Sequence, residues 1–286
     1  MLSEVSHTEV LTHNDEHFNQ QGWKAELKLG FVRSSNKTTL SQRSQYGPLT
    51  VQRPFYPEGG VCHVYLLHPP GGVVAGDQLS IDVNVDKNAQ ALITTPGAAK
   101  FYRSIGKQAF QSVSLKVSDG ATLEWLPQET IVFEGANIIS NVNVDLSNNA
   151  RFIGWEILVL GRPAASESFT EGQALLQWQI FRDGEPLFLE KIRLDSEAFL
   201  ARWGLNGCSS CGTLFANGAS ASNLEAVRDL IADTPGRGVT LIDDLLICRA
   251  SDKKTQLIRH FFEKVRSLIR SDIVQQQPHT PRIWAT

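Results

Sequence analysis

The most restrictive feature of the sequence is a threefold internal repeat of strand-like segments. The stretches SIDVNVDKNAQALI, SVSLKVSDGATLEW and NVNVDLSNNARFIG each read as an alternating strand, a polar turn, an alanine and a second strand. When they are aligned on Ala89, Ala121 and Ala150, the positions four, six and eight residues earlier are apolar in all three, and the spacings are 32 and 29 residues. A period near 30 in strand-rich sequence predicts stacked β units, each covering the apolar face of its neighbour.

The same period-two alternation begins close to the N-terminus, where apolar residues are separated mainly by charged ones. Its apolar positions are Trp23, Ala25, Leu27, Leu29 and Phe31. This spacing is typical of a half-buried strand. We therefore predict a mainly β fold, with a layered body that is β-helix-like or sandwich-like and extends over about residues 22–206.

Two α-helices are predicted near the C-terminus, at about residues 222–233 and 254–271. Both segments place apolar residues three or four positions apart, which is the spacing of an amphipathic helix. These positions are Leu224, Val227, Leu230 and Ile231 in the first segment, and Leu257, Phe261, Val265 and Leu268 in the second. We assign residues 22–286 to a single domain.

The first 21 residues are polar and acidic and contain three of the seven histidines, His7, His13 and His17. A flexible leader is favoured over a loose metal site there. The leader does not have the apolar stretch of a secretory signal, and no apolar run approaches the roughly 18 residues that cross a bilayer. The net charge of −3 argues against nucleic acid as a partner. We expect a cytoplasmic protein that does not associate with membranes.

Two groups of residues suggest catalytic or metal chemistry. Glu124 and Glu129 flank Trp125, and a pair of carboxylates beside an aromatic ring would suit a β-rich glycoside hydrolase. Cys208 and Cys211 have the C-x-x-C spacing of half a zinc site or of a redox pair, but no second such motif follows. An inert loop is the favoured interpretation of the cysteines, and the hydrolase remains an alternative hypothesis.

The stretch HPPGGVVAGDQL, residues 68–79, places Gly71 and Gly76 at the glycine spacing of a phosphate-binding loop. Such a loop continues with Lys and then Ser or Thr, which contact the phosphates and magnesium. Here the next residues are Asp77 and Gln78. Because a carboxylate would repel phosphate, we do not expect this turn to bind a nucleotide.

Several segments in order resemble the UreD family of urease accessory proteins, which is also called UreH. They are HPPGGVVAGDQL, ALITTPGAAKFYRS, ATLEWLPQETIVFEGA, GWEILVLGRPA and the terminal PRIWAT. The resemblance extends from residue 22 to the end of the chain. The leader and the C-x-x-C loop depart from the family pattern and inherit no role from it.

The resemblance implies a scaffold protein rather than an enzyme, with no catalytic residues and no permanently bound cofactor. Members of the family bind apo-urease together with UreF and UreG, a GTPase that carries nickel. The complex, a hetero-oligomer containing two copies of the chain, delivers Ni²⁺ through an internal tunnel. The resemblance also implies a mostly β, layered body with two helices, in agreement with the repeat and the predicted helices.

The resemblance further implies which residues contact the metal ion or the partners. Asp77, Glu156 and Glu190 are candidate carboxylates along a transient Ni²⁺ path. The alternative for Asp77 is that it caps backbone N–H groups of its own turn. Trp284, Arg282 and Phe261 are candidate contacts for a partner protein, and ordinary packing is the alternative for the apolar stripe of the last helix.

Overall fold

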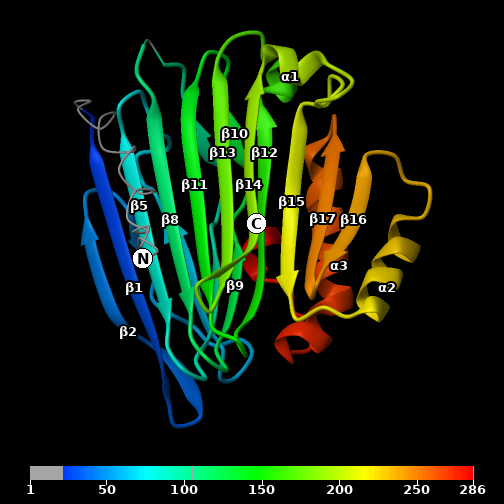
Figure 1. Ribbon diagram of the computed structural model, residues 1–286. Helices are drawn as coiled ribbons and strands as arrows, with labels where there is room; N and C mark the ends of the chain where they lie inside the picture. Colours follow the sequence, from blue (N-terminus) through cyan, green and yellow to red (C-terminus); the bar gives the residue numbers. More distant parts are fainter. Residues whose placement is uncertain (1–21, 105, 286) are drawn as a thin grey trace, which may run out of the picture.

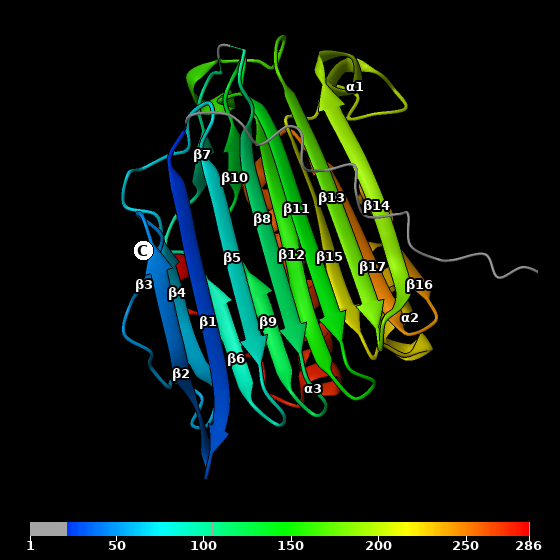
Figure 2. The same ribbon diagram turned by 60° about the vertical axis from the view of Figure 1, so that its left-hand side comes forward.

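Two β-sheets that face each other make up most of the structure, a computed structural model that describes residues 22–104 and 106–285. Figure 2 shows the first sheet in front of the second. The predicted leader, residues 1–21, lies outside the described residues. The mainly β class predicted from the alternating pattern is confirmed.

The first sheet has seven strands and the second has ten. The first contains, in spatial order, β14 (Glu185–Asp195), β13 (Gln173–Arg182), β11 (Asn137–Leu146), β8 (Ala109–Val117), β5 (Gln78–Val85), β1 (Lys24–Ser34) and β2 (Lys37–Tyr46). The second contains β16 (Arg237–Ile242), β17 (Leu245–Asp252), β15 (Ser210–Asn217), β12 (Arg151–Leu160), β9 (Thr122–Leu126), β6 (Gln90–Thr94), β4 (Cys62–Leu67) and β3 (Thr50–Val51). Two short strands complete it, β7 (Ala99–Phe101) and β10 (Thr130–Val132).

The chain passes alternately between the two sheets and so forms stacked coils. Strands β5, β8, β11 and β13 are parallel neighbours in the first sheet, and β4, β6, β9 and β12 are parallel neighbours in the second. A parallel pair needs a crossover connection, and here each crossover is a strand of the opposite sheet. This arrangement is the solenoid that the repeat predicted.

The pairing register reproduces the sequence repeat residue by residue. Ile81 pairs with Val113, and Val113 pairs with Val142, so the repeat spacings of 32 and 29 residues are the register of the sheet. Each repeat alanine is buried and donates its backbone N–H to the carbonyl three residues earlier. These alanines are Ala89, Ala121 and Ala150. A small side chain is therefore required where the chain turns from one sheet to the other.

Apolar side chains from both sheets fill the space between them. In β8, Val113, Leu115 and Val117 are buried there, while Lys116 lies on the outer face and is exposed. The alternation predicted for the first strand holds from Ala25 onward. Trp23 is 69% exposed, because β1 begins only at Lys24.

The two predicted helices are present as α2 (Ala221–Ile231) and α3 (Thr255–Val274). α3 packs on the outer face of the second sheet, behind β12, β15 and β17 in Figure 1. A second apolar core lies between them, and it includes Trp155 and Phe262. No helix among the described residues has the length and apolar character required to cross a bilayer.

The structure extends the β body beyond the predicted end at residue 206. Strands β15, β16 and β17 all follow it and continue the second sheet. A five-residue helix, α1 (Ser196–Leu200), was also not predicted; its N-cap Asp195 accepts a hydrogen bond from the Ala198 N–H. Two 3-10 helices span Pro163–Ala165 and Arg282–Ala285. Sequence periodicity did not identify these elements; α1 and the two 3-10 helices have five residues or fewer, and β15 follows a small-residue loop.

We expect Leu115→Ala to destabilise the protein by about 2–5 kcal/mol, because the substitution leaves a cavity in the core between the sheets. Lys116→Ala, one residue further along the same strand, removes only an outward-facing side chain and should change stability by less than about 0.5 kcal/mol. Urea denaturation of both variants measures the difference. Similar losses for the two would contradict the assignment of strand faces.

Candidate functional site

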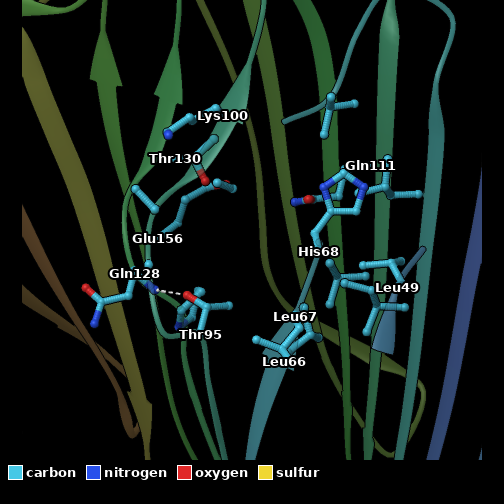
Figure 3. A pocket seen from close by; sticks show the side chains of 18 of the residues that line it. Leu49, Leu66, Leu67, His68, Thr95, Lys100, Gln111, Gln128, Thr130 and Glu156 are labelled. Carbon is cyan, nitrogen blue, oxygen red and sulfur yellow. Dashed lines mark hydrogen bonds between the residues drawn. The ribbon is translucent and has the colours of Figure 1, made fainter. Parts of the chain in front are cut away.

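A cavity of about 430 Å³ lies between the two sheets and is lined mainly by apolar side chains. Its few polar groups come from several strands and turns. Figure 3 shows Lys100, Thr130 and Glu156 on one wall. His68 and Gln111 lie on the opposite wall. A mostly apolar cavity with a small number of polar groups is the usual form of a binding site.

His68 follows β4 and is half-buried at this first cavity. Burial lowers its pKa, and the negative charge of Asp77 acts in the opposite direction without offsetting it. The imidazole is therefore neutral at pH 7, and a neutral imidazole has one nitrogen lone pair that can bind a metal ion.

A second cavity, of about 510 Å³, adjoins the first. Both cavities are lined by Glu156 of β12 and Trp178 of β13, so these two residues mark the place where they meet. The ionisable residues on the wall of the second cavity are Glu156, Glu190, Arg193, Cys211, Arg237 and Arg249. Together the two cavities extend from the first coils toward the opposite edges of both sheets.

Glu156 occupies the junction because β12 turns alternate residues toward the other sheet. Its Oε2 accepts a hydrogen bond of 3.0 Å from Trp178 Nε1, and the hydroxyl of Ser140 also bonds to the carboxyl group. Ser140 in turn accepts from Gln111 Nε2 at 3.4 Å. Glu156 is thus held between the sheets by neutral groups.

The environment of Glu156 disfavours its charged form. Burial raises its pKa to about 7, and the nearby charge of Glu190 adds to the rise, while the hydrogen bonds from Trp178 and Ser140 only partly oppose it. The carboxyl group therefore gains or loses a proton near neutral pH. Glu190 is held differently, since Arg249 donates a hydrogen bond to its Oε1.

Comparison with known proteins identifies the family of the chain. The family described as UreD urease accessory protein matches residues 24–285. The chain belongs to the UreD family. A protein named urease accessory protein UreD from Citrobacter koseri is 43% identical over 271 residues, which cover 93% of each chain. Relatives of the same name from Alcanivorax borkumensis and Pseudoalteromonas translucida are each 42% identical, over 275 and 276 residues. These cover 93% and 92% of this chain, and 93% and 91% of the relatives.

The family resemblance inferred from the quoted segments is thereby confirmed, and the chain has a role in urease maturation. The three carboxylates suggested by that resemblance differ in their surroundings. Glu156 and Glu190 of this UreD-family chain both line the second cavity. Asp77 lines neither of these two cavities.

Asp77 has the structural role that was the alternative for its turn. Its Oδ2 accepts from the backbone N–H of Val74 and its Oδ1 from that of Trp23, both at 3.0 Å. Because both oxygens cap backbone groups, Asp77 fixes the turn and the entry into β1. A place for Asp77 on the Ni²⁺ path stays a prediction.

The contacts of Glu124 contradict the glycoside hydrolase hypothesis. Glu124 lies on the outer face of β9 and is fully buried beneath α3. Arg266 Nε donates to its Oε1 at 2.8 Å, and Arg270 Nη2 donates to its Oε2 at 2.8 Å. Burial would raise the pKa of Glu124, but the two guanidinium groups hold it below its ordinary value. An acid catalyst needs the opposite shift.

Glu129, the other half of that proposed pair, is bound to the same helix. Arg259 Nε donates to Glu129 Oε1 at 2.8 Å, and a second guanidinium nitrogen contacts the other oxygen. Glu124 and Glu129 therefore anchor α3 to the second sheet and are not available as an acid and base.

The buried cluster beneath α3 extends to a third carboxylate. Arg270 Nη2 donates to Glu58 Oε1 at 2.9 Å, and His63 Nε2 lies 2.7 Å from the same oxygen. Burial opposes ionisation of Glu58, yet His63 and Arg270 lower its pKa to about 2. The cluster thus joins a loop, a strand and the last helix through ionic hydrogen bonds.

One of the three proposed partner contacts requires correction. Phe261 is 8% exposed and packs in the core between α3 and the second sheet, so it is not an accessible docking residue. Trp284 is half-buried, with its Nε1 donating to Thr94 Oγ1 at 2.9 Å. Its packing is therefore within its own chain. Arg282 is exposed, and its partner role stays a prediction.

The two cysteines of the C-x-x-C segment pack against the core between the sheets. Cys211 lines the second cavity, where burial raises the pKa of its thiol to about 12 and the charge of Glu156 adds to the rise. Within residues 22–104 and 106–285, no three His, Cys, Asp or Glu side chains are grouped so as to hold a metal ion.

Sequence reasoning missed Trp178 and Arg249, which contact the two cavity carboxylates. Trp178 is the middle of an alternating segment, LLQWQIF, that places it on the same face as Leu176 and Ile180. That pattern was sufficient to predict an inward-facing side chain. Nothing in the sequence indicates that Arg249 reaches across to the other sheet.

We expect Glu124→Gln to destabilise the protein by about 3–5 kcal/mol, because the guanidinium groups of Arg266 and Arg270 lose their shared buried counter-charge. Glu225→Gln on α2, which removes an exposed ion pair with Arg228, should cost less than about 1 kcal/mol. Urea denaturation of the two variants compares them. Equal small losses would show that the cluster does not anchor α3.

Glu156→Gln should stabilise the protein increasingly as the pH rises. Between the ordinary pKa of 4.5 and the folded value of about 7, the unfolded chain has lost the proton that folded Glu156 keeps, so wild-type stability falls through this window. Gln does not ionise. The stability of the variant relative to wild type should therefore be about 1–3 kcal/mol more favourable at pH 8 than at pH 5. Thermal unfolding at both pH values measures it, and an equal difference at both would contradict the raised pKa.

Proposed function

We propose that this chain is a non-enzymatic scaffold that delivers Ni²⁺ to apo-urease through the space between its two sheets. The observation that carries the proposal is that two cavities adjoin at Glu156, and that the second also contains Glu190. The resemblance to the UreD family motivates the choice of nickel as cargo. The proposed partners are UreF and the nickel-carrying GTPase UreG, in a cytoplasmic complex containing two copies of the chain.

The polar groups of the cavities suit transient binding of the metal ion. Imidazole and carboxylate are both ligands for divalent first-row metals, and a site with few ligands binds them weakly. The first cavity has the neutral imidazole of His68, the junction has Glu156, and the second cavity has Glu190. A cation can be attracted at each position without being held permanently at any of them.

The proton affinity of Glu156 supports the same function. At pH 7 and in the absence of a cation, a carboxyl group with a pKa near 7 is protonated about half the time. An approaching cation favours the charged form and displaces the proton. The junction therefore carries little permanent charge, which reduces the free-energy cost of keeping a carboxylate between two apolar sheets.

The test is urease maturation in cells that express the urease structural and accessory genes together with Glu156→Gln or Glu190→Gln variants of this chain. We expect the nickel content of purified urease to fall by about tenfold or more. The reason is that loss of one carboxylate raises the free energy of a cation in the cavity by at least about 1.4 kcal/mol. Glu225→Gln, an exposed substitution on α2, is the matched control.

Pull-down of the partner proteins from the same cells separates transport from assembly. We expect UreF, UreG and urease to co-purify with each variant as with wild type. Normal nickel content in both variants, with the complex intact, would contradict the proposed path. Loss of partners together with nickel would instead assign the two carboxylates to assembly.

A further inference from the structure

The ion pair between Glu190 and Arg249 connects the two sheets at the second cavity. Glu190 belongs to β14, the last strand of the first sheet, and Arg249 belongs to β17, next to the last strand of the second sheet. Both residues line the cavity. The side chain of Arg249 is 45% exposed and that of Glu190 is 20% exposed, so the pair lies at the solvent side of the cavity.

The pairing registers place the groups of this cavity in two facing rows. On the second sheet, Glu156 pairs with Thr213 and Thr213 pairs with Arg249, so the row crosses three neighbouring strands. On the first sheet, Trp178 pairs with Glu190. Two cross-sheet contacts join the rows, Trp178 to Glu156 and Arg249 to Glu190. Neighbouring strands are about 4.8 Å apart, so Glu156 and Arg249 start about 10 Å from each other.

The other two arginines of this cavity bind carboxylates outside its wall. Arg193 Nε is 3.0 Å from Asp195 Oδ2, and Arg237 Nη2 is 2.9 Å from Asp252 Oδ2. Neither Asp195 nor Asp252 lines the cavity. Arg249 is thus the arginine that neutralises a carboxylate of the cavity itself.

We propose that Arg249 acts as a competing cation that prevents the second cavity from retaining a divalent metal ion. This inference rests on the proposed function and deepens it. Without the guanidinium group, the Glu190 carboxylate would carry an uncompensated negative charge on the wall of the cavity. An unpaired carboxylate attracts a divalent cation more strongly than one that is already ion-paired with an arginine.

The exposure of the pair makes the competition reversible. Ion pairs of this exposure contribute about 0–1 kcal/mol, so a divalent cation can displace the guanidinium from Glu190. Because Arg249 is always charged, it rebinds Glu190 when the cation leaves, and this rebinding favours release. The buried pair of Arg270 and Glu124 could not exchange in this way, because separating it would leave two buried charges without partners.

The test is the dissociation constant for Ni²⁺ of the full-length chain, measured by calorimetry. Arg249→Met should bind Ni²⁺ about fivefold more tightly than wild type, which corresponds to removing a competitor worth about 1 kcal/mol. Arg249→Lys keeps the charge and should bind as wild type does. The double variant Arg249→Met/Glu190→Gln should lose this gain in Ni²⁺ affinity. Arg228→Met, which removes an exposed arginine on α2, is the matched control.

An affinity of Arg249→Met equal to or weaker than that of wild type would overturn the proposal. If Arg249→Met does not fold, the Ni²⁺ affinities of Arg249→Gln and Arg249→Lys are compared instead. Failure of this proposal can be distinguished from failure of the proposed function. The proposed function is tested separately, by the nickel content of urease in the carboxylate variants. If Arg249→Met binds Ni²⁺ more tightly while the carboxylate variants load urease with nickel as wild type does, the competition at Arg249 is supported and the transport path is contradicted.

Discussion

Parallel pairing between successive coils is the constraint on which the rest of the structure depends. The register that pairs Ile81 with Val113 and Val113 with Val142 fixes which side chains face the other sheet, because a shift of one residue would turn every apolar side chain outward. The same register places Ser140 and Trp178 opposite Glu156. The position of the candidate site thus follows from the repeat.

Two carboxylates on neighbouring strands of the second sheet show how the two faces of that sheet differ. Glu124 points outward beneath α3, where Arg266 and Arg270 stabilise its negative charge. Glu156 points inward, where its partners are neutral and its pKa is near 7. The outer face is therefore built for permanent ionic anchoring of a helix. The inner face keeps a carboxyl group whose charge can change at little cost, which is the property that transient cation binding requires.

The sequence predicted the elements that local periodicity determines. The repeat predicted the stacked coils, and apolar spacing predicted α2 and α3 to within a few residues. It did not reveal the contacts between distant segments. Glu124 meets Arg270 across 146 positions, and Glu190 meets Arg249 across 59. Glu124 and Glu129 therefore resembled a catalytic pair in sequence, although α3 engages both.

The span of the cluster beneath α3 has a consequence for synthesis on the ribosome. Arg270 reaches Glu58 across 212 positions, so this contact cannot form until α3 has been synthesised. The apolar core on the outer face of the second sheet, which includes Ile153 and Trp155, is completed by α2, by α3 and by Trp284. A nascent chain therefore presents this apolar face, with Glu124 still lacking its counter-charges, until nearly the whole sequence has been translated. That interval is when the chain is most prone to aggregate.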